Sequence, residues 1–338
     1  MHLQERIALL VRLGQYMQGE EEAWAGAKHK AFLENNWFIP EFINTSVQHI
    51  TSQYLQENQL SDLARDYQIP DQPSTPKKVG IVLPGTTPLA GFHDILSVFL
   101  TGHYALIKTS ARDEALLKHL VGKLQEWAPE GALYFSLAAM LKGCDAYIAT
   151  NTKETTASFD QYFSKYPSLI RRSKTAVAVL TGHETNEELE KLGDDIHLYF
   201  GLGSRNVTKF YVPKGYDFVP LLNAFKKYEY FSNHHKFKNN YDYNLSIQIL
   251  NNQFYMTNGS ILLTEAPALF SPISQIYYEF YTDKSQLLEQ LQQREDIESI
   301  VGQQQIPFGK SNFPDITSFE KGANTLDFLN NLNAAKKV

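Results

Sequence analysis

The chain has 338 residues, 43% hydrophobic and 20% charged, which is the composition of an ordinary globular protein with room for two domains. Its formal net charge of -6 argues against a nucleic-acid partner, which would need a clustered basic surface. The single cysteine, Cys144, excludes an internal disulfide and fits a reducing compartment. Because no stretch reaches the roughly 18 apolar residues of a membrane helix, we expect a cytoplasmic protein without an integral membrane segment.

The first part of the chain is predicted to be helical. Apolar side chains recur at helical spacing from Met1 to about Leu63, and three prolines between Ile69 and Pro76 mark a boundary. We therefore expect a helical segment over residues 1–75 that packs on the domain after it.

Short apolar runs then alternate with helical stretches. The predicted strands are Val79–Leu83, Tyr104–Lys108 and Ala146–Ala149, and the predicted helices are Leu89–Leu100, Asp113–Trp127 and Lys153–Ser164. This alternation indicates a parallel sheet covered on both faces, which is a Rossmann-type α/β domain over residues 76–175.

A second α/β domain is expected over residues 176–310, with a return segment over residues 311–338. Its predicted elements are a strand at Ala176–Leu180, a helix at Asn186–Phe200, a strand at Val207–Val212, several strands between Ser246 and Tyr281, and a helix at Lys284–Gln293.

The carboxyl edge of the first sheet is a candidate ligand site. A turn of sequence Pro84-Gly85-Thr86-Thr87-Pro88 follows the first strand, and Lys108 to Arg112 follow the second. Ligands of open α/β sheets bind at this edge, and a lysine, hydroxyls and an arginine suit ribose or phosphate oxygens. Ordinary loop chemistry is the alternative for each motif alone.

The turn from Gly201 to Asn206 is a candidate nucleophile turn. It joins a predicted helix to a predicted strand, where a side chain can be exposed beside backbone N–H groups that face a developing oxyanion. Ser204 would need a general base, and none is evident nearby in the sequence.

Two further features suggest no chemistry. Adjacent His234 and His235 do not share one face of a helix or strand, so we expect a hydrogen-bonded loop rather than a metal site. Cys144 precedes a strand, where a buried, unreactive thiol is usual.

Several of these segments resemble a known family in the same order. The stretch Gly102–Ser110 after the Pro-Gly-Thr-Thr-Pro turn looks like the cofactor side of aldehyde dehydrogenases, and Phe200–Pro213 resembles the nucleophile turn and strand of the LuxC-type acyl-CoA reductases. The resemblance covers roughly Val79 to Leu329, and it extends to Asp145–Thr152, Tyr162–Arg172, Asn239–Asn244, Ser271–Ile273 and Pro307–Lys310.

The resemblance implies an aldehyde-dehydrogenase-like fold with a cofactor domain and a catalytic domain. It implies reduction of an acyl-CoA thioester, of fatty acid metabolism or another source, to the aldehyde through an acyl-enzyme, within a homo-oligomer or beside a partner enzyme. Ala111 and Arg112 stand where many hydrolytic relatives carry a glutamate near the ribose, which favours NADPH, with NADH as the alternative. The implied cofactor-binding residues are Pro84, Gly85, Lys108, Ser110, Arg112 and Thr150.

The chain departs from the family at the reacting positions. Ser204 stands where the family has its catalytic cysteine, and Thr86 stands where an oxyanion-hole asparagine is common in the wider superfamily. The general-base glutamate of the hydrolytic enzymes corresponds to about Ile170 in this chain. The implied catalytic positions are Ser204, Thr86 and Asn206. Serine in place of cysteine is a severe change, because an alkoxide is harder to form than a thiolate. Three explanations compete: a laboratory substitution, a natural loss of catalysis, and a serine-based acyl transfer. The alternative function is an inactive protein that binds acyl-CoA or nucleotide and acts through a partner.

Overall fold

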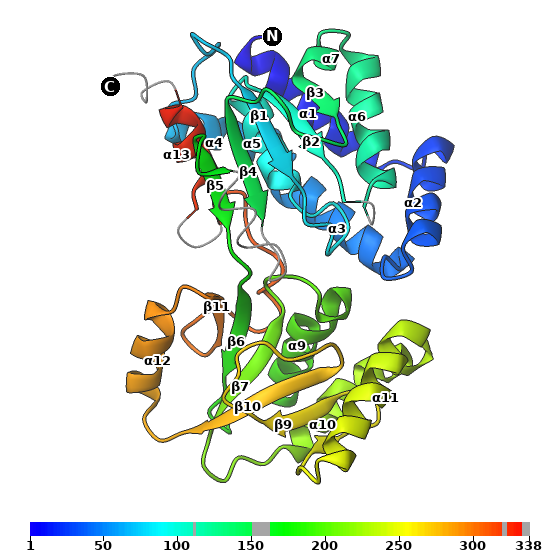
Figure 1. Ribbon diagram of the computed structural model, residues 1–338, viewed down its shortest axis with the longest axis vertical. Coiled ribbons are helices and arrows are strands. Elements are labelled where there is room, and N and C mark those ends of the chain that lie inside the picture. Colours follow the sequence, from blue (N-terminus) through cyan, green and yellow to red (C-terminus); the bar gives the residue numbers. More distant parts are fainter. Residues whose placement is uncertain (111–112, 151–162, 320–322, 333–338) are drawn as a thin grey trace. The chain divides into compact units, whose positions relative to one another are not determined.

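The computed structural model describes residues 1–110, 113–150, 163–319 and 323–332. The chain divides into two compact units, each with its own sheet (Figure 1). Unit 1 comprises Met1–Ser173 and Pro314–Val338, and unit 2 comprises Lys174–Phe313.

Unit 1 contains a five-stranded parallel sheet of order β3-β2-β1-β4-β5. Its strands are β1 (Lys78–Val82), β2 (Tyr104–Lys108), β3 (Phe135–Leu137), β4 (Ala146–Thr150) and β5 (Ser168–Arg171). Its helices are α1 (Leu3–Gln18), α2 (Glu22–Glu34), α3 (Pro40–Gln53), α4 (Glu57–Asp66), α5 (Phe92–Leu100), α6 (Ala115–Trp127), α7 (Gly131–Tyr134) and α13 (Thr325–Asn331).

The central strands of unit 1 are buried on both faces. Val79, Ile81 and Ile107 share one apolar core with α1, α3, α5 and α6, whereas Leu106 and Tyr147 face a smaller core on the other side. Burial on both faces explains why the strands read as continuous apolar runs.

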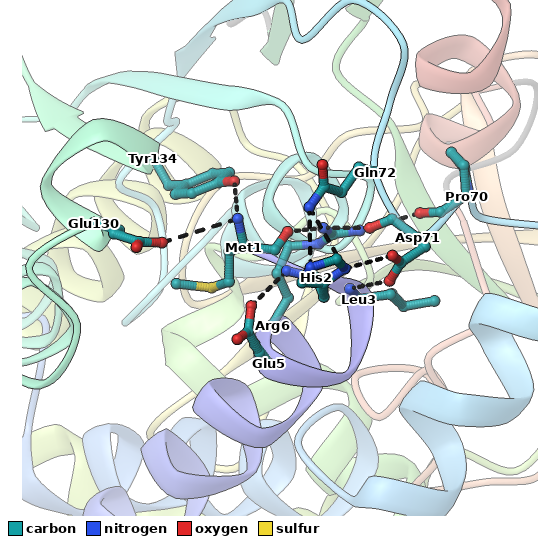
Figure 2. Close-up of polar contacts among 10 residues, drawn as sticks. All are labelled: Met1, His2, Leu3, Glu5, Arg6, Pro70, Asp71, Gln72, Glu130 and Tyr134. Carbon is teal, nitrogen blue, oxygen red and sulfur yellow. Dashed lines mark hydrogen bonds and ion pairs between the residues drawn. The ribbon is translucent and has the colours of Figure 1, made fainter.

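A buried arginine joins the first helix to the segment before β1 (Figure 2). The Arg6 guanidinium is fully buried and donates to the backbone carbonyls of Leu100 at 3.1 Å, Met1 at 2.8 Å and Asp71 at 3.0 Å. His2 and the Leu3 N–H bind the Asp71 carboxylate. A buried charge is costly unless its donors are satisfied, and these carbonyls satisfy the Arg6 guanidinium. The contacts thereby fix α1 against the amino-terminal side of the sheet.

A buried ion pair fixes the carboxyl-terminal helix α13 to unit 1. Arg171, at the end of β5, donates to both carboxylate oxygens of Asp94 at 2.7 and 2.9 Å, and Thr325 at the start of α13 contacts both partners. Burial acts to raise the pKa of Asp94, but the Arg171 guanidinium lowers it overall, so the carboxylate is ionised.

Unit 2 contains a six-stranded sheet of order β11-β6-β7-β10-β9-β8, parallel except for the edge strand β8. Its strands are β6 (Thr175–Val179), β7 (Val207–Pro213), β8 (Met256–Thr257), β9 (Leu262–Glu265), β10 (Gln275–Tyr281) and β11 (Ile297–Gly302). Its helices are α9 (Asn186–His197), η1 (Leu198–Gly201), α10 (Val219–Ala224), η2 (Phe225–Asn233), α11 (His235–Leu250) and α12 (Lys284–Gln293).

The unit 2 sheet has an apolar core on each face, as the side chains of strand β6 show. Ala176 and Ala178 pack with α9 and α10 on one face, whereas Val177 and Val179 pack with α12 on the other. Unit 2 is therefore a three-layer α/β structure, like unit 1.

Most of the predicted elements are present, with shifted ends. The helices predicted to begin at Leu89 and Asp113 begin at Phe92 and Ala115, and the helix predicted to reach Phe200 ends at His197. The helix predicted at residues 153–164 falls mainly outside the described residues. Among the described residues, no helix is long and apolar enough to cross a membrane.

The stretch around the paired histidines was predicted wrongly. His234 caps the start of α11 by accepting a hydrogen bond from the Phe237 N–H, and His235 begins that helix, so the stretch is not a loop. The residues from Ser246 to Leu250 continue the helix instead of forming a strand. The described residues contain no group of three histidine, cysteine, aspartate or glutamate side chains that could hold a metal ion.

Candidate functional site

The candidate cofactor edge lies in unit 1, where β2, β1 and β4 end side by side. In the parallel register Val82 lies opposite Lys108 on one strand and opposite Ala149 on the other. Lys108 and Thr150, the last residues of β2 and β4, therefore flank the turn that follows β1. Lys108 is exposed and Thr150 is half-buried, so both can contact a ligand at this edge.

Gly85 brings the turn after β1 against the loop after β2. Its φ is 62°, in the left-handed region that glycine adopts readily. A Cβ at this position would lie 2.3 Å from the Cβ and 2.5 Å from the Oγ of Ser110, so no larger residue fits. A bare glycine turn at the carboxyl edge of a parallel sheet is a surface on which a dinucleotide phosphate can pack.

A buried carboxyl group, Asp113, holds this turn in place. Its Oδ2 accepts a hydrogen bond from the Leu89 N–H at 2.8 Å, and its own N–H donates to the Ser110 carbonyl at 3.0 Å. Leu89 has a φ of 58°, a strained conformation for leucine. Burial raises the pKa of Asp113 to about 8, although the N–H groups of Leu89 and Ala90 act to lower it, so the carboxyl keeps its proton at neutral pH.

Ser204 lies in unit 2, in a tight turn between η1 and β7. The Asn206 N–H donates to the Gly203 carbonyl at 3.1 Å, and the Gly203 N–H donates to the Asn206 Oδ1 at 2.8 Å. The Ser204 side chain is half-buried, and no described residue forms a hydrogen bond with its hydroxyl. Within the described part of the chain, the turn therefore presents Ser204 without a general base in contact with it.

Asn206 supports that turn from the interior of unit 2. Its side chain is fully buried, and its Nδ2 donates to the carbonyls of Leu198 at 2.9 Å and Asp195 at 3.0 Å. These carbonyls belong to the end of α9, where the helix leaves acceptors unsatisfied. The Asn206 amide thus joins the helix end to the Ser204 turn, and a catalytic role for Asn206 stays a prediction.

The backbone before the turn is strained. Tyr199 and Phe200 have φ values of 55° and 56°, and Gly201 follows at 75°. Left-handed conformations are costly for bulky residues, and such strain gathers at functional sites. Both rings are buried, and Phe200 packs against Phe231 at a centroid distance of 4.6 Å, which holds the strained backbone. Nothing in a Tyr-Phe dipeptide could have predicted this conformation.

Asp195 connects the same helix end to the segment near Pro307. Its Oδ2 accepts from the Gly309 N–H at 2.7 Å, and its Oδ1 accepts from the Ser311 N–H at 2.9 Å and the Ser311 hydroxyl at 2.8 Å. Burial raises the pKa of Asp195 to about 6, although these hydrogen bonds act to lower it. Asp195 was not predicted from the sequence, although its position three residues after Leu192 places it on the buried face of α9 and could have indicated it.

An ion-paired carboxylate lies beside the Ser204 turn. The Glu298 side chain is 1% exposed and pairs with Arg205 at 3.0 Å and with Lys174 at 3.6 Å. Arg205 follows Ser204 directly, so Glu298 fixes the second central residue of the turn. This pair was not predicted from the sequence.

The predicted site residues fall into two sets. Pro84, Gly85, Thr86, Lys108, Ser110 and Thr150 gather at the carboxyl edge of the unit 1 sheet, and Ser204 and Asn206 share one turn of unit 2. Arg112 lies outside the described residues. Cys144 is buried, and burial raises the pKa of its thiol, as expected for an unreactive cysteine.

The amino-acid sequence matches no family model and no curated protein. The fold, in contrast, is similar to that of solved aldehyde dehydrogenases. The Mycobacterium tuberculosis aldehyde dehydrogenase complexed with NAD+ has a TM-score of 0.64 and 12% identity, over 86% of this chain and 70% of that chain.

Two further structures show the same likeness. Aldehyde dehydrogenase 21 from Physcomitrella patens, in complex with the reaction product succinate, has a TM-score of 0.65 and 13% identity over 89% of this chain and 74% of that chain. An NADP dependent enzyme of E. coli has a TM-score of 0.62 and 11% identity over 89% of this chain and 73% of that chain. The aldehyde-dehydrogenase-like α/β fold expected from the sequence is therefore confirmed.

Proposed function

We propose that this chain is a nicotinamide-cofactor-dependent oxidoreductase of the aldehyde dehydrogenase type, or a protein descended from one. The observation that carries the proposal is the carboxyl edge of the unit 1 sheet, where Gly85, Lys108, Ser110 and Thr150 meet. These residues offer a bare backbone turn, a cation and two hydroxyls. A phosphate and ribose ligand needs such groups.

The cofactor we propose is NADPH, with NADH as the alternative. Lys108 is exposed at the end of β2, where it can bind ribose hydroxyls, and the Ser110 side chain lies against the Gly85 turn. The solved structures with this fold include one complexed with NAD+ and one described as NADP dependent, so the fold is compatible with either cofactor. Bound at this edge, the cofactor would supply or accept the hydride.

The substrate we propose is an acyl-CoA thioester. The nucleophile on the turn between η1 and β7 would attack the thioester carbonyl, the bond from carbon to sulfur would break, and CoA would leave as the thiol after taking a proton. A hydride delivered to the resulting acyl group would release the aldehyde and restore the nucleophile. Ser204 makes the first step difficult, because an alkoxide is harder to form than a thiolate and no base among the described residues contacts the hydroxyl.

A second function is favoured by Ser204 itself. A chain that keeps the cofactor edge but lacks an activated nucleophile would bind nucleotide or acyl-CoA without turnover, and would act through a partner enzyme or within a homo-oligomer. The strained backbone at Tyr199 and Phe200, just before the Ser204 turn, favours the enzyme instead, because such strain gathers at functional sites.

Nucleotide titration tests the part that both functions share. The full chain and the Lys108→Ala variant are titrated with NADPH and with NADH by calorimetry, with Lys118→Ala as the control because Lys118 is exposed on α6 and pairs with Glu114. We expect Lys108→Ala to weaken binding by about tenfold or more, because a charge-assisted hydrogen bond is lost. If neither nucleotide binds the unmodified chain, or if both variants bind equally well, the cofactor edge is assigned wrongly.

A further inference from the structure

A small pocket lies behind the Ser204 turn, entirely within unit 2. It is lined by Phe200 and Gly201, which precede the turn, and by Val207 and Thr208, which follow it. Its volume is about 20 Å³. On the same measure a water molecule needs roughly 10–15 Å³, so the pocket can hold one small group.

Most polar side chains that line this pocket already have partners. Thr208 donates to the Leu269 carbonyl at 2.9 Å, Gln275 donates to Thr264 at 2.7 Å, and Ser274 donates to the Ile273 carbonyl at 2.5 Å. The other lining side chains are mainly apolar. The pocket therefore favours a small ligand group with few polar atoms.

Two buried polar atoms of the lining residues have no partner among the described residues. They are His197 Nε2 and Ser271 Oγ. Buried polar groups in native proteins nearly always have a hydrogen-bond partner, since an unsatisfied group is costly. Two such atoms on residues that line one pocket point to a ligand that supplies both bonds.

The protonation of His197 decides what this ligand must offer. Its Nδ1 lies 2.8 Å from the Gly193 carbonyl, which can only accept, so Nδ1 carries the proton and Nε2 is an acceptor. Burial lowers the pKa of His197 to about 4, which keeps the ring neutral, and the ring stacks on Tyr228 at 4.4 Å. The ligand must therefore donate a proton to Nε2, while the Ser271 hydroxyl can donate to the ligand.

We propose that this pocket binds a hydroxyl group that donates to His197 Nε2 and accepts from Ser271 Oγ–H. The hydroxyl comes from water or from a small organic ligand such as an alcohol, because both have the same donor and acceptor. A group in this position joins the end of α9, which precedes the Ser204 turn, to the loop before β10. The inference needs no catalytic turnover, so it stands or fails independently of the proposed function.

Nuclear magnetic resonance of the full chain with 15N-labelled histidine tests the site. The resonance of an unprotonated imidazole nitrogen moves upfield when the nitrogen accepts a hydrogen bond. It is recorded for the chain alone, with ethanol as a hydroxyl probe, and with acetonitrile as a small solute without O–H. His197→Phe assigns the resonance, and His197→Gln assigns it if the phenylalanine variant does not fold. Ser246→Ala is the control, because Ser246 is on α11 and bonds only within that helix.

Each outcome decides the proposal. A bonded Nε2 that Ser271→Ala frees supports the site. Saturable shifts with ethanol alone then identify an organic hydroxyl, with affinity lowered about three- to tenfold in Ser271→Ala, whereas no response to ethanol identifies water. A free Nε2 in the chain with and without ethanol overturns the proposal, and so does a bonded Nε2 that Ser271→Ala leaves unchanged.

Discussion

At Asn206 a single buried amide fixes both ends of the Ser204 turn. Its oxygen holds the Gly203 N–H, and its nitrogen holds the carbonyls at the end of α9. The carbonyls of Asp195 and Leu198 are buried with it, so water cannot replace their hydrogen bonds without opening the structure. Asn206 is therefore a positioning residue for Ser204, whatever chemistry that serine performs.

We predict that Asn206→Ala lowers the free energy of unfolding by about 3 kcal/mol, because several buried backbone groups lose their partner. Urea denaturation followed by circular dichroism measures the change. Asn240→Ala is the matched control, since Asn240 is only half-buried and donates only to the Lys236 carbonyl, and it should change the stability by less than about 0.5 kcal/mol. Equal effects of the two substitutions would contradict the role assigned to Asn206.

Asp113 gives the stability a pH dependence with a definite sign. Its pKa is raised from 3.8 to about 8 in the folded chain, so between these values the unfolded chain has released a proton that the folded chain keeps. The free energy of unfolding therefore falls as the pH rises through this window, by about 1.4 kcal/mol per pH unit, and this contribution levels off above pH 8.

The variant Asp113→Asn lacks this titration but keeps an oxygen for the Leu89 N–H. We expect its stability relative to the unmodified chain to increase steadily between pH 5 and pH 8 and to change little above pH 8. Urea denaturation at intervals of one pH unit measures the difference. A difference that is constant with pH would show that Asp113 is ionised in the folded chain.

Helix α9 carries the Ser204 turn at its carboxyl end, and its amino end is fixed by a capping box. The Thr185 hydroxyl accepts from the Glu188 N–H at 3.2 Å, and the Glu188 carboxylate accepts from the Thr185 N–H at 2.8 Å. Thr185→Ala should lower the free energy of unfolding by about 1 kcal/mol.

Thr45→Ala is the matched control for this helix cap, because Thr45 is half-buried in the interior of α3 and bonds only to the carbonyl of Glu41. Thermal unfolding of the two variants compares them. A loss no larger for Thr185→Ala than for Thr45→Ala would rule out the capping box as a source of stability.

Strands in buried parallel sheets could be predicted from the sequence where both faces are apolar, as in β1, β2 and β6. The three-residue strand β3 is too short to show a pattern, and β5 and β11 contain polar or charged residues. Helix α11 was missed because its few buried side chains, Phe237, Tyr241 and Asn244, lie among many polar residues.

The candidate site was only partly predictable for a different reason. Ligands of open α/β sheets bind at the carboxyl ends of the strands, so Lys108 and Thr150 could be predicted as site residues from the order of strands and helices. Long-range contacts leave no local signal in the chain. The pairing of Arg205 with Glu298 and the bond from Asp113 to Leu89 depend on folding and became visible only in the structure.

At the scale of the whole molecule, the buried pair of Arg171 and Asp94 joins the carboxyl-terminal helix to unit 1. Arg171→Met would leave the Asp94 carboxylate buried without its partner, and we predict a loss of about 3–5 kcal/mol. The double variant Arg171→Met, Asp94→Leu should recover much of this loss, because no buried charge then remains. Chemical denaturation of both variants is the measurement, and a double variant as unstable as the single one would argue against a charge effect.

We propose that unit 1 binds a nicotinamide cofactor at its sheet edge and that unit 2 presents a nucleophile position at Ser204. The fold is that of aldehyde dehydrogenases. Placing a cysteine at position 204 is the most direct way to connect this fold to an activity, because a thiolate forms far more readily than an alkoxide.

The decisive measurement is therefore NADPH oxidation with a series of acyl-CoA thioesters, carried out in parallel on the unmodified chain and on Ser204→Cys. We predict slow or no turnover by the unmodified chain and clear turnover by Ser204→Cys, with release of one CoA for each NADPH oxidised. If Ser204→Cys folds and binds NADPH but neither oxidises it nor releases CoA with any thioester, the turn is not a nucleophile site for this reaction and the account is contradicted.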